Sequence, residues 1–317
     1  MILTITHSED YYTTDLVADY LKENEIDSIR INSDDFPQKY QISSSFPSNK
    51  SLILQNKDQV IDLKKVQAVW LRKFWKPKVD STMDEKYKNY SLNESLETIK
   101  GLFYTLNDIF WIDRLNHIEL SSNKMLQLKI AAQIGLKIPE TLITNNQKQL
   151  KFFYLKNNRN IITKMQKALS CTMNSDGVFF YTQKLHDDDI NNSGMLELCP
   201  MVFQEEIKKD YELRVIYVDG NYFTGKLSTK DKLTDTRVTN ATNYKWETYE
   251  LPKTLEIQLD ILMHKLNLHF GAIDIIRSTN GDYYFLEVNP TGEWGMLQKE
   301  LNLPIAQAIG KTLIKNI

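Results

Sequence analysis

The sequence is short of cysteine, glycine and proline, and it carries no large excess of either charge. Its 317 residues include 2 cysteines, 11 glycines and 8 prolines. The two thiols, Cys171 and Cys199, can form neither a disulfide framework nor a four-thiolate zinc site. So few glycines and prolines exclude a collagen-like or linker-dominated chain. With 39 basic and 41 acidic residues the net charge is −2, which argues against a general nucleic-acid-binding protein.

Long apolar runs are also missing. No stretch approaches the roughly 20 consecutive apolar residues that a membrane-spanning helix needs, so we expect no membrane association. The apolar start at residues 1–7 has no basic region ahead of it, which argues against a signal peptide and favours a cytoplasmic protein. Five histidines and two cysteines leave few soft ligands, so any metal chemistry should use oxygen. The histidines have no matched partners that would indicate a Ser/His/Asp or Cys/His catalytic set.

What remains is an ordinary globular composition, 42% hydrophobic and 25% charged, in a chain long enough for more than one domain. Short β-branched runs alternate with amphipathic stretches, which predicts an α/β (α+β) fold. We expect an N-terminal α/β domain over residues 1–115, a central subdomain over 116–198 and a C-terminal subdomain over 199–317.

The individual elements follow from periodicity, capping residues and turn signals. Predicted strands lie at Ile2–Thr6, Ser28–Asn32, Ser51–Gln55, Ala68–Leu71, Thr141–Thr144, Ile161–Met165, Val178–Thr182 and Met201–Ile207. Predicted helices cover 13–23, 92–110, 124–134, 146–157, 254–269 and 304–316. Residues 168–177 and 187–194 are predicted to be loops. Two hairpins are predicted, one with its turn at 219–221 and one with its turn at 279–282.

The second hairpin carries the most specific chemical signal. Asn280-Gly281 predicts a two-residue turn, which places Asp274 directly across from Glu287. Side chains alternate between the two faces of a strand, so Asn289 should share the face of Glu287. Opposed like charges are destabilising, and such a pair calls for a cation. Two carboxylates and an amide oxygen suit Mg²⁺, held together with substrate phosphates. We expect Glu287 to bridge two ions, with Asp274 on one and Asn289 on the other; the alternative is an incidental pair on a solvated face.

Three further segments are typical of a nucleotide cleft. Lys164 interrupts an apolar strand, and a lysine in that setting usually points into a functional cleft, unless the strand lies at an edge. The polar end of the strand after Gln204 (Glu205, Glu206 and Ile207) could offer backbone groups to a base and a carboxylate to a ribose. Surface glutamate pairs are common, so this second signal is weak by itself.

Arg214 lies in the first hairpin. It could hold a phosphate or carboxylate through two hydrogen bonds, with Glu212 on the same strand face orienting it. An exposed ion pair is the alternative. Lys226 lies on the partner strand, where the turn leaves its register open.

Taken in order, these motifs resemble those of a known family. They are Asn123-Lys124 opening a helix, GLKIPETLIT (135–144), FQEEI (203–207), DYELRVIYVDG (210–220), GAIDII (271–276) and FLEVNPTGEWG (285–295). Over most of its length the chain resembles the ATP-grasp superfamily. More narrowly, IPETLIT and EVNPTGEW resemble the graspetide synthetases, the microviridin-type peptide ligases. VWLRKFWKP (69–77) is similar to the Arg-bearing motif at the end of that family's N-terminal domain.

The resemblance implies a pre-ATP-grasp domain followed by two sheet-containing subdomains that sandwich ATP. It also implies residue roles. Nucleotide contacts fall to Lys124, Lys164, Gln204, Glu205, Glu206, Ile207 and Lys226; metal binding to Asp274, Glu287 and Asn289; catalysis to Arg214, Lys164 and Glu212; peptide contacts to Arg72, Lys73 and Thr291. The expected cofactors are ATP and two Mg²⁺ ions. The expected partners are a precursor peptide with a leader helix and a second copy of the chain.

The implied reaction activates an Asp or Glu side chain of a precursor peptide as an acyl phosphate. A hydroxyl or amine of the same peptide then displaces phosphate, giving an ω-ester or ω-amide macrocycle. Two alternatives remain open. One is an ATP-grasp carboxylate–amine ligase that acts on amino acids or a protein C-terminus, and the other is a non-catalytic nucleotide-binding protein of the same fold.

Overall fold

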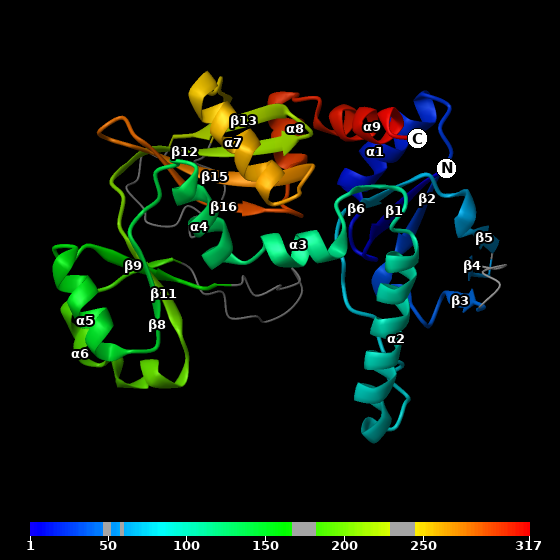
Figure 1. The fold of residues 1–317 in the computed structure, drawn as a ribbon, viewed down its shortest axis with the longest axis horizontal. Coiled ribbons are helices and arrows are strands. Elements are labelled where there is room, and N and C mark those ends of the chain that lie inside the picture. The colour runs from blue at the N-terminus through cyan, green and yellow to red at the C-terminus, as the bar shows by residue number, and fades with distance from the viewer. Residues whose placement is uncertain (47–51, 58–59, 167–181, 229–244) are drawn as a thin grey trace.

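The structure is a computed structural model, and it describes residues 1–46, 52–57, 60–166, 182–228 and 245–317. The described chain comprises an N-terminal α/β unit, a small central lobe and a larger C-terminal sheet (Figure 1). Most of the predicted strand Val178–Thr182, the predicted loop 168–177, Cys171 and Ser51 lie outside the described residues.

A parallel sheet forms the centre of the N-terminal unit. Its order is β2 (Ser28–Asn32), β1 (Ile2–Thr6), β6 (Ala68–Leu71), β7 (Phe110–Ile112). A second, three-stranded sheet contains β3 (Gln41–Ser44), β4 (Leu52–Gln55) and β5 (Val60–Asp62). The helices are α1 (Tyr12–Glu23), α2 (Glu85–Thr105) and α3 (Leu115–Ser121).

The predicted helix 92–110 differs from α2 at both ends. The Asp84 side chain caps the start of α2 by accepting a hydrogen bond from the Lys86 amide, as N-cap residues do. Its far end gives way to β7, which begins at Phe110 and which the sequence did not predict. The segment was interpreted from its helical periodicity, so the three-residue strand at its end was not predicted.

The central lobe contains an antiparallel sheet in the order β10 (Gln183–Lys184), β9 (Ile161–Lys164), β11 (Met201–Glu205), β8 (Thr141–Thr144). Helices α5 (Gln147–Lys156) and α6 (Asp187–Asn191) and the 3₁₀ segment Ser193–Leu198 pack against it. The predicted loop 187–194 is therefore wrong. Asp189 accepts a hydrogen bond from the His186 amide and starts α6. Helix α4 (Lys124–Gln133) leads from the N-terminal unit into this lobe.

The C-terminal sheet has the order β14 (Trp246–Thr248), β13 (Asn221–Leu227), β12 (Lys209–Val218), β15 (Phe270–Ser278), β16 (Tyr283–Asn289). Its helices are α7 (Lys253–Lys265), α8 (Gly295–Leu301) and α9 (Ile305–Lys315).

The predicted turn between β15 and β16 is wrong, although the strand pairing deduced from it is confirmed. The Ser278 amide donates to the Asp282 carbonyl at 2.8 Å, so the loop has three residues and ends on Gly281 at φ 88°. That shifts the register by one, to Ile275 opposite Phe285. A bulge at Leu286 shifts it back, and Asp274 then pairs with Glu287. The two errors in the sequence prediction, the length of the turn and the missing bulge, compensated for each other, so the predicted pairing was correct.

The bulge also decides which face each side chain of β16 takes. Phe285 and Val288 are both buried in one core with α7, although they are three residues apart. Regular alternation would put them on opposite faces, and the extra residue of the bulge puts them on the same one. Glu287 and Asn289 consequently face the other side of the sheet.

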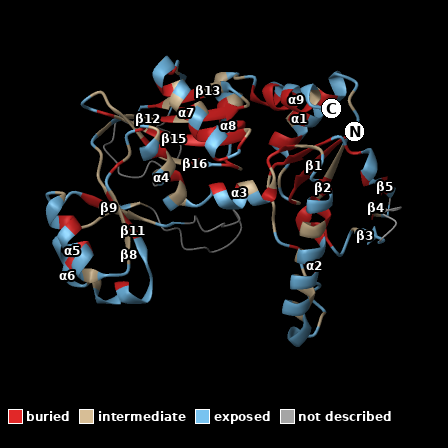
Figure 2. Cartoon of the chain, viewed as in Figure 1, coloured by how far each residue is buried: buried red, intermediate tan, exposed pale blue. Residues whose placement is uncertain are grey.

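That other side is covered over only part of its area. Ile216, Val218, Phe270 and Ala272 pack there in one core with residues of β1, β6, α1, α8 and α9. This shared core joins the N-terminal and C-terminal parts of the chain, and α9 lies against α1 (Figure 1). Figure 2 shows the buried residues gathered at this junction. The rest of the same face carries the partly buried Arg214, Asp274 and Glu287.

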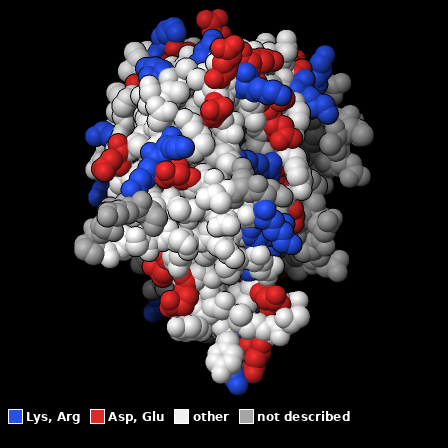
Figure 3. Space-filling model, turned by 90° about the vertical axis from the view of Figure 1, so that its right-hand side faces the viewer, with Lys and Arg blue, Asp and Glu red and all other residues white. Residues whose placement is uncertain are grey.

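In the described part of the chain, no helix is both long and apolar enough to cross a membrane. Lysine and arginine side chains alternate with aspartate and glutamate on the face drawn in Figure 3. That distribution agrees with the near-zero net charge.

The shared core predicts that α9 stabilises the whole chain. Ile309 is fully buried in it, so Ile309→Ala should lower the free energy of unfolding by about 2–5 kcal/mol, measured by urea denaturation. Lys311→Ala on the exposed side of the same helix should change it by less than about 0.5 kcal/mol. Equal losses for the two variants would contradict the shared core.

Candidate functional site

Beyond the shared core, the same face of the C-terminal sheet brings together three charged residues from neighbouring strands. Arg214 pairs with Asp274, and Asp274 pairs with Glu287. Directly paired residues share a face, so these side chains form a row across β12, β15 and β16. The Arg214 Nε lies 3.2 Å from Asp274 Oδ1.

Lys124 adds a cation from the start of α4. Its Nζ lies 2.6 Å from Glu287 Oε2 and donates to the Met165 carbonyl at 3.1 Å. Burial disfavours the ionised form of Glu287, but the charges of Lys124, Lys164 and Arg214 outweigh burial and hold its pKa below the ordinary value. Glu287 is therefore a carboxylate at neutral pH, and Lys124 connects β16 to the end of β9.

Lys164 comes from the facing sheet of the central lobe. Ile161 on the same strand is buried against α5 and α6, so alternation turns Lys164 to the opposite side. The charge of Lys164 acts on Glu287. The two sheets and α4 thus place three cations around one carboxylate.

Three residues at the polar end of β11 make hydrogen bonds or ion pairs within the central lobe. Gln204 is buried, and its amide donates to Thr141 Oγ1 at 2.9 Å. Glu205 accepts from the Glu140 amide at 3.2 Å. The Glu206 carboxylate lies 2.5 Å from Lys184 Nζ, and Ile207 is partly buried beside it.

Lys184 is a cation that sequence analysis missed. It pairs with Ile162, which places it on the same side of the central sheet as Lys164. The signal in the sequence was a second lysine in a short strand. A strand of two residues shows no periodicity, so the sheet face of its side chains could not be deduced.

Gln127 is a second missed residue. It is buried on α4, its amide oxygen accepts from the Val288 amide at 2.9 Å, and its amide nitrogen donates to the Val288 carbonyl at 2.8 Å. The side chain thereby takes the place of a neighbouring strand at the edge of β16, between Glu287 and Asn289. A glutamine in the buried stripe of a predicted helix was the available signal.

The donor set at this site is too small for a metal held by protein alone. Within the described residues, no group of three or more His, Cys, Asp and Glu side chains could hold a metal ion. Asp274, Glu287 and the Asn289 amide supply two carboxylates and one amide oxygen. Mg²⁺ typically takes such a set together with phosphate oxygens. The residues fit a magnesium–nucleotide complex.

Of two other predicted residues, Glu212 lies on the expected strand face and Lys226 does not lie at this site. Glu212 shares the strand face of Arg214, and its Oε1 accepts from Lys209 Nζ at 2.6 Å. Lys226 pairs with Leu213, which is buried on the α7 side. Its ammonium lies 4.8 Å from the Tyr211 ring centroid and 3.5 Å from the Glu247 carboxylate. Lys226 is therefore on the sheet face opposite to Asp274, and the structure does not bring it to this site.

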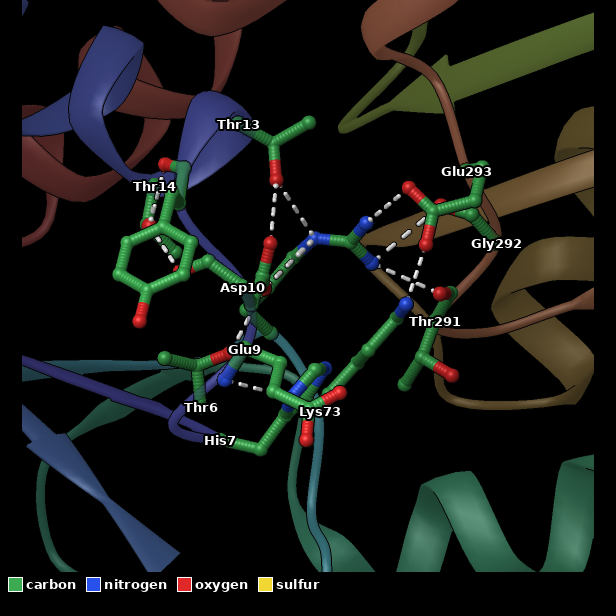
Figure 4. Close-up of polar contacts among 12 residues, drawn as sticks. Thr6, His7, Glu9, Asp10, Thr13, Thr14, Lys73, Thr291, Gly292 and Glu293 are labelled. Atoms are coloured by element: carbon green, nitrogen blue, oxygen red, sulfur yellow. Dashed lines mark hydrogen bonds and ion pairs between the residues drawn. The ribbon is translucent and has the colours of Figure 1, made fainter. Parts of the chain in front are cut away.

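Of the three residues expected to contact a peptide, Arg72 and Lys73 both pair with Glu293, and Arg72 also binds the Thr291 carbonyl. The Arg72 side chain is 1% exposed and donates to the Thr291 carbonyl at 2.7 Å and to Glu293 Oε2 at 2.8 Å. Lys73 also pairs with Glu293, and Figure 4 shows these two side chains pointing toward each other. Because it is buried and bound to protein acceptors, Arg72 is not available to a peptide.

Removing the Lys124 cation should raise the pKa of Glu287, because burial favours the protonated form and less positive charge would then oppose it. The lowered pKa means that the stabilising contribution of Glu287 is present above the unfolded-state value, near 4.5, and is lost as pH falls through the folded-state value. In Lys124→Met that loss should move to higher pH, as followed by carboxyl ¹³C NMR titration with Glu287→Gln for assignment. Lys129→Met on the same helix is the control, and an unchanged titration in Lys124→Met would contradict the pairing.

Comparisons with known proteins address the whole chain. Residues 1–119 match the MvdD pre-ATP grasp domain. Macrocyclase MdnC from Microcystis aeruginosa MRC, solved with its precursor peptide MdnA, is 33% identical over 100% of both chains, with a TM-score of 0.90. Macrocyclase MdnB from the same organism is 38% identical over 99% of this chain and 98% of its own, with a TM-score of 0.86.

A RiPP-associated ATP-grasp ligase from Chryseobacterium gregarium, solved with ADP and a leader and core peptide, is 28% identical. The match covers 100% of this chain and 97% of that one, with a TM-score of 0.89. No match was found among curated proteins. From the full-length similarity and the arrangement of the two facing sheets, the chain belongs to the graspetide-type ATP-grasp synthetases and is an ATP-dependent ligase.

Proposed function

We propose that this ligase closes side-chain macrocycles in a ribosomally made precursor peptide. The observation that carries the proposal is the Asp274–Glu287 pair on the sheet face that looks toward the central lobe, surrounded by Lys124, Lys164 and Arg214. Such an arrangement suits a polyphosphate and its metal. Full-length similarity to two macrocyclases supports a peptide as the acceptor of the phosphoryl group.

In this proposal ATP lies between the central and C-terminal sheets. The base would lie at the polar end of β11, where Glu205, Glu206 and Ile207 follow Gln204. Lys164 and Lys124 would neutralise phosphate charge. Asp274, Glu287 and Asn289 would hold one or two Mg²⁺ ions, which would supply charge neutralisation at the phosphates when bound.

The chemistry needs no nucleophile from the protein. A carboxylate oxygen of a peptide Asp or Glu attacks the γ-phosphorus of ATP, and the bond to the ADP oxygen breaks. A hydroxyl or amine of the same peptide then attacks the acyl carbon, loses its proton, and phosphate leaves. The expected product is an ω-ester or ω-amide ring. Arg214 would stabilise the transferred phosphate or the reacting carboxylate, and the protein would contribute mainly orientation and charge.

Two partners belong to the same proposal. Recognition of a leader segment is supported by the Chryseobacterium gregarium ligase, which was solved with a leader and core peptide. A leader helix and a homodimer stay predictions from the family resemblance.

Incubation with ATP, Mg²⁺ and the cognate precursor peptide should lower the mass of the peptide by one water for each ring. Mass spectrometry measures the loss, and tandem spectra locate the joined side chains. If free amino acids are ligated and no precursor loses water, the chain is an amino-acid ligase. If neither substrate supports ATP turnover, the non-catalytic alternative holds.

The metal assignment predicts a specific loss in Glu287→Gln. ATP hydrolysis stimulated by peptide should fall by roughly a hundredfold or more, as when a preorganised charge-stabilising group is removed. The matched control is Glu247→Gln, which changes a carboxylate on the opposite face of the same sheet. Circular dichroism checks that both variants fold, and normal turnover in Glu287→Gln would show that the site is misassigned.

A further inference from the structure

The end of β16 that carries Asn289 continues into a tight turn. The Thr291 amide donates to Asn289 Oδ1 at 3.1 Å, and the Gly292 amide donates to the Asn289 carbonyl at 3.1 Å. A Cβ atom on Gly292 would lie 2.3 Å from the Ala272 Cβ, so the turn packs directly against β15. The orientation of the Asn289 amide therefore depends on where Thr291 and Gly292 are held.

Arg72 holds this turn from the N-terminal unit. It follows β6, and its Nη1 donates to the carbonyls of Thr291 at 2.7 Å and Gly292 at 3.4 Å. Its Nη2 donates to Glu293 Oε2 at 2.8 Å, and its Nε donates to Thr13 Oγ1 at 3.3 Å. All three guanidinium nitrogens thus have protein acceptors. A planar fork with several donors can hold these acceptors simultaneously, and a lysine cannot.

The charged side chains around Arg72 make its contact with the turn difficult to replace. Asp10 lies 3.7 Å from Arg72 Nε, and Glu293 is shared with Lys73. Burial opposes ionisation of Asp10, but Arg72 and its other partners hold the pKa of that carboxyl below its ordinary value. Figure 4 shows Asp10 and Thr13 on one side of this cluster and Thr291, Gly292 and Glu293 on the other. The cluster therefore connects α1 and β6 to the turn.

Gln127 holds the same end of β16 one residue before Asn289, through its two hydrogen bonds to Val288. Asn289 thus lies between a residue held from α4 and a turn held from β6. Both residues are buried, at 2% exposure each for the whole residue. A buried polar side chain is retained only with its hydrogen bonds satisfied. Here several of the partners belong to this one stretch of backbone, and the others are the Ser121 carbonyl for Gln127 and the Thr13 and Glu293 side chains for Arg72.

We infer that Arg72 and Gln127 are positioning residues for the metal ligands of β16. They act through the backbone of Val288, Thr291 and Gly292, and they contact neither ATP nor peptide. Residues that orient metal ligands commonly change metal affinity by about 10- to 100-fold when mutated. The inference rests on the proposed metal site and goes beyond it, because it makes the N-terminal unit a determinant of metal affinity.

The test measures metal binding directly. Mn²⁺ is titrated into each protein with saturating ADP, and free Mn²⁺ is followed by electron paramagnetic resonance. Arg72→Lys and Gln127→Met should weaken Mn²⁺ binding about 10- to 100-fold, with ADP affinity without metal unchanged. Glu293→Gln, at an exposed side chain, tests the cluster without risk to the fold and should give a smaller loss in the same direction.

Asp113→Asn is the matched control. Asp113 is buried and accepts from the His269 and Phe270 amides at 2.8 and 3.0 Å, so it joins the N-terminal unit to the start of β15 and makes no hydrogen bond to the turn in the described part of the chain. It should destabilise the chain to thermal unfolding and leave Mn²⁺ affinity unchanged.

Two results would overturn the inference. One is unchanged Mn²⁺ affinity in Arg72→Lys, Gln127→Met and Glu293→Gln. The other is an equal loss of affinity in Asp113→Asn, which would indicate general loosening between the parts of the chain. Glu287→Gln distinguishes failure of the positioning role from failure of the proposed metal site. If it binds Mn²⁺ as the parent does, the metal site itself is wrong and the positioning role fails with it.

Discussion

Two carboxylates face each other across neighbouring strands, and the rest of the site depends on how their repulsion is offset. Paired like charges destabilise a sheet, yet Asp274 and Glu287 remain directly opposed. The compensating cations come from different parts of the chain. Arg214 lies on β12, Lys124 on α4 and Lys164 on the central lobe. The site is therefore complete only where the central lobe faces the C-terminal sheet.

The cores of the molecule explain which parts hold that arrangement. One core runs from β1 and α1 through α9 to β12 and β15, so the N-terminal unit and the C-terminal sheet are packed together. The central lobe has its own smaller core around Phe153 and Phe203. Nucleotide would bind between a body with a continuous core and a lobe that packs by itself, with Lys124 in contact with both sides.

Several buried polar side chains of this molecule hold backbone. Arg72 and Gln127 each make two of their hydrogen bonds to the backbone around Asn289. Asp113 does the same at the start of β15. In each case the polar group is buried, where its contribution depends on its hydrogen bonds being satisfied. Contacts of this kind fix the position of a backbone more sharply than hydrophobic packing does.

The sequence by itself determined most element types and the family resemblance, because these depend on local periodicity and on motifs that are contiguous in the chain. It also predicted the pairing of Asp274 with Glu287, but only because the wrong turn length and the missing bulge compensated for each other. Tertiary structure decided the rest. The bulge at Leu286 appeared only with the folded pairing, and Lys226 turned out to lie on the far face of the sheet. Arg72 proved to hold a turn more than two hundred residues away in the chain. No local pattern encodes such a contact, since it arises only when β6 and the end of β16 are brought together by a common core.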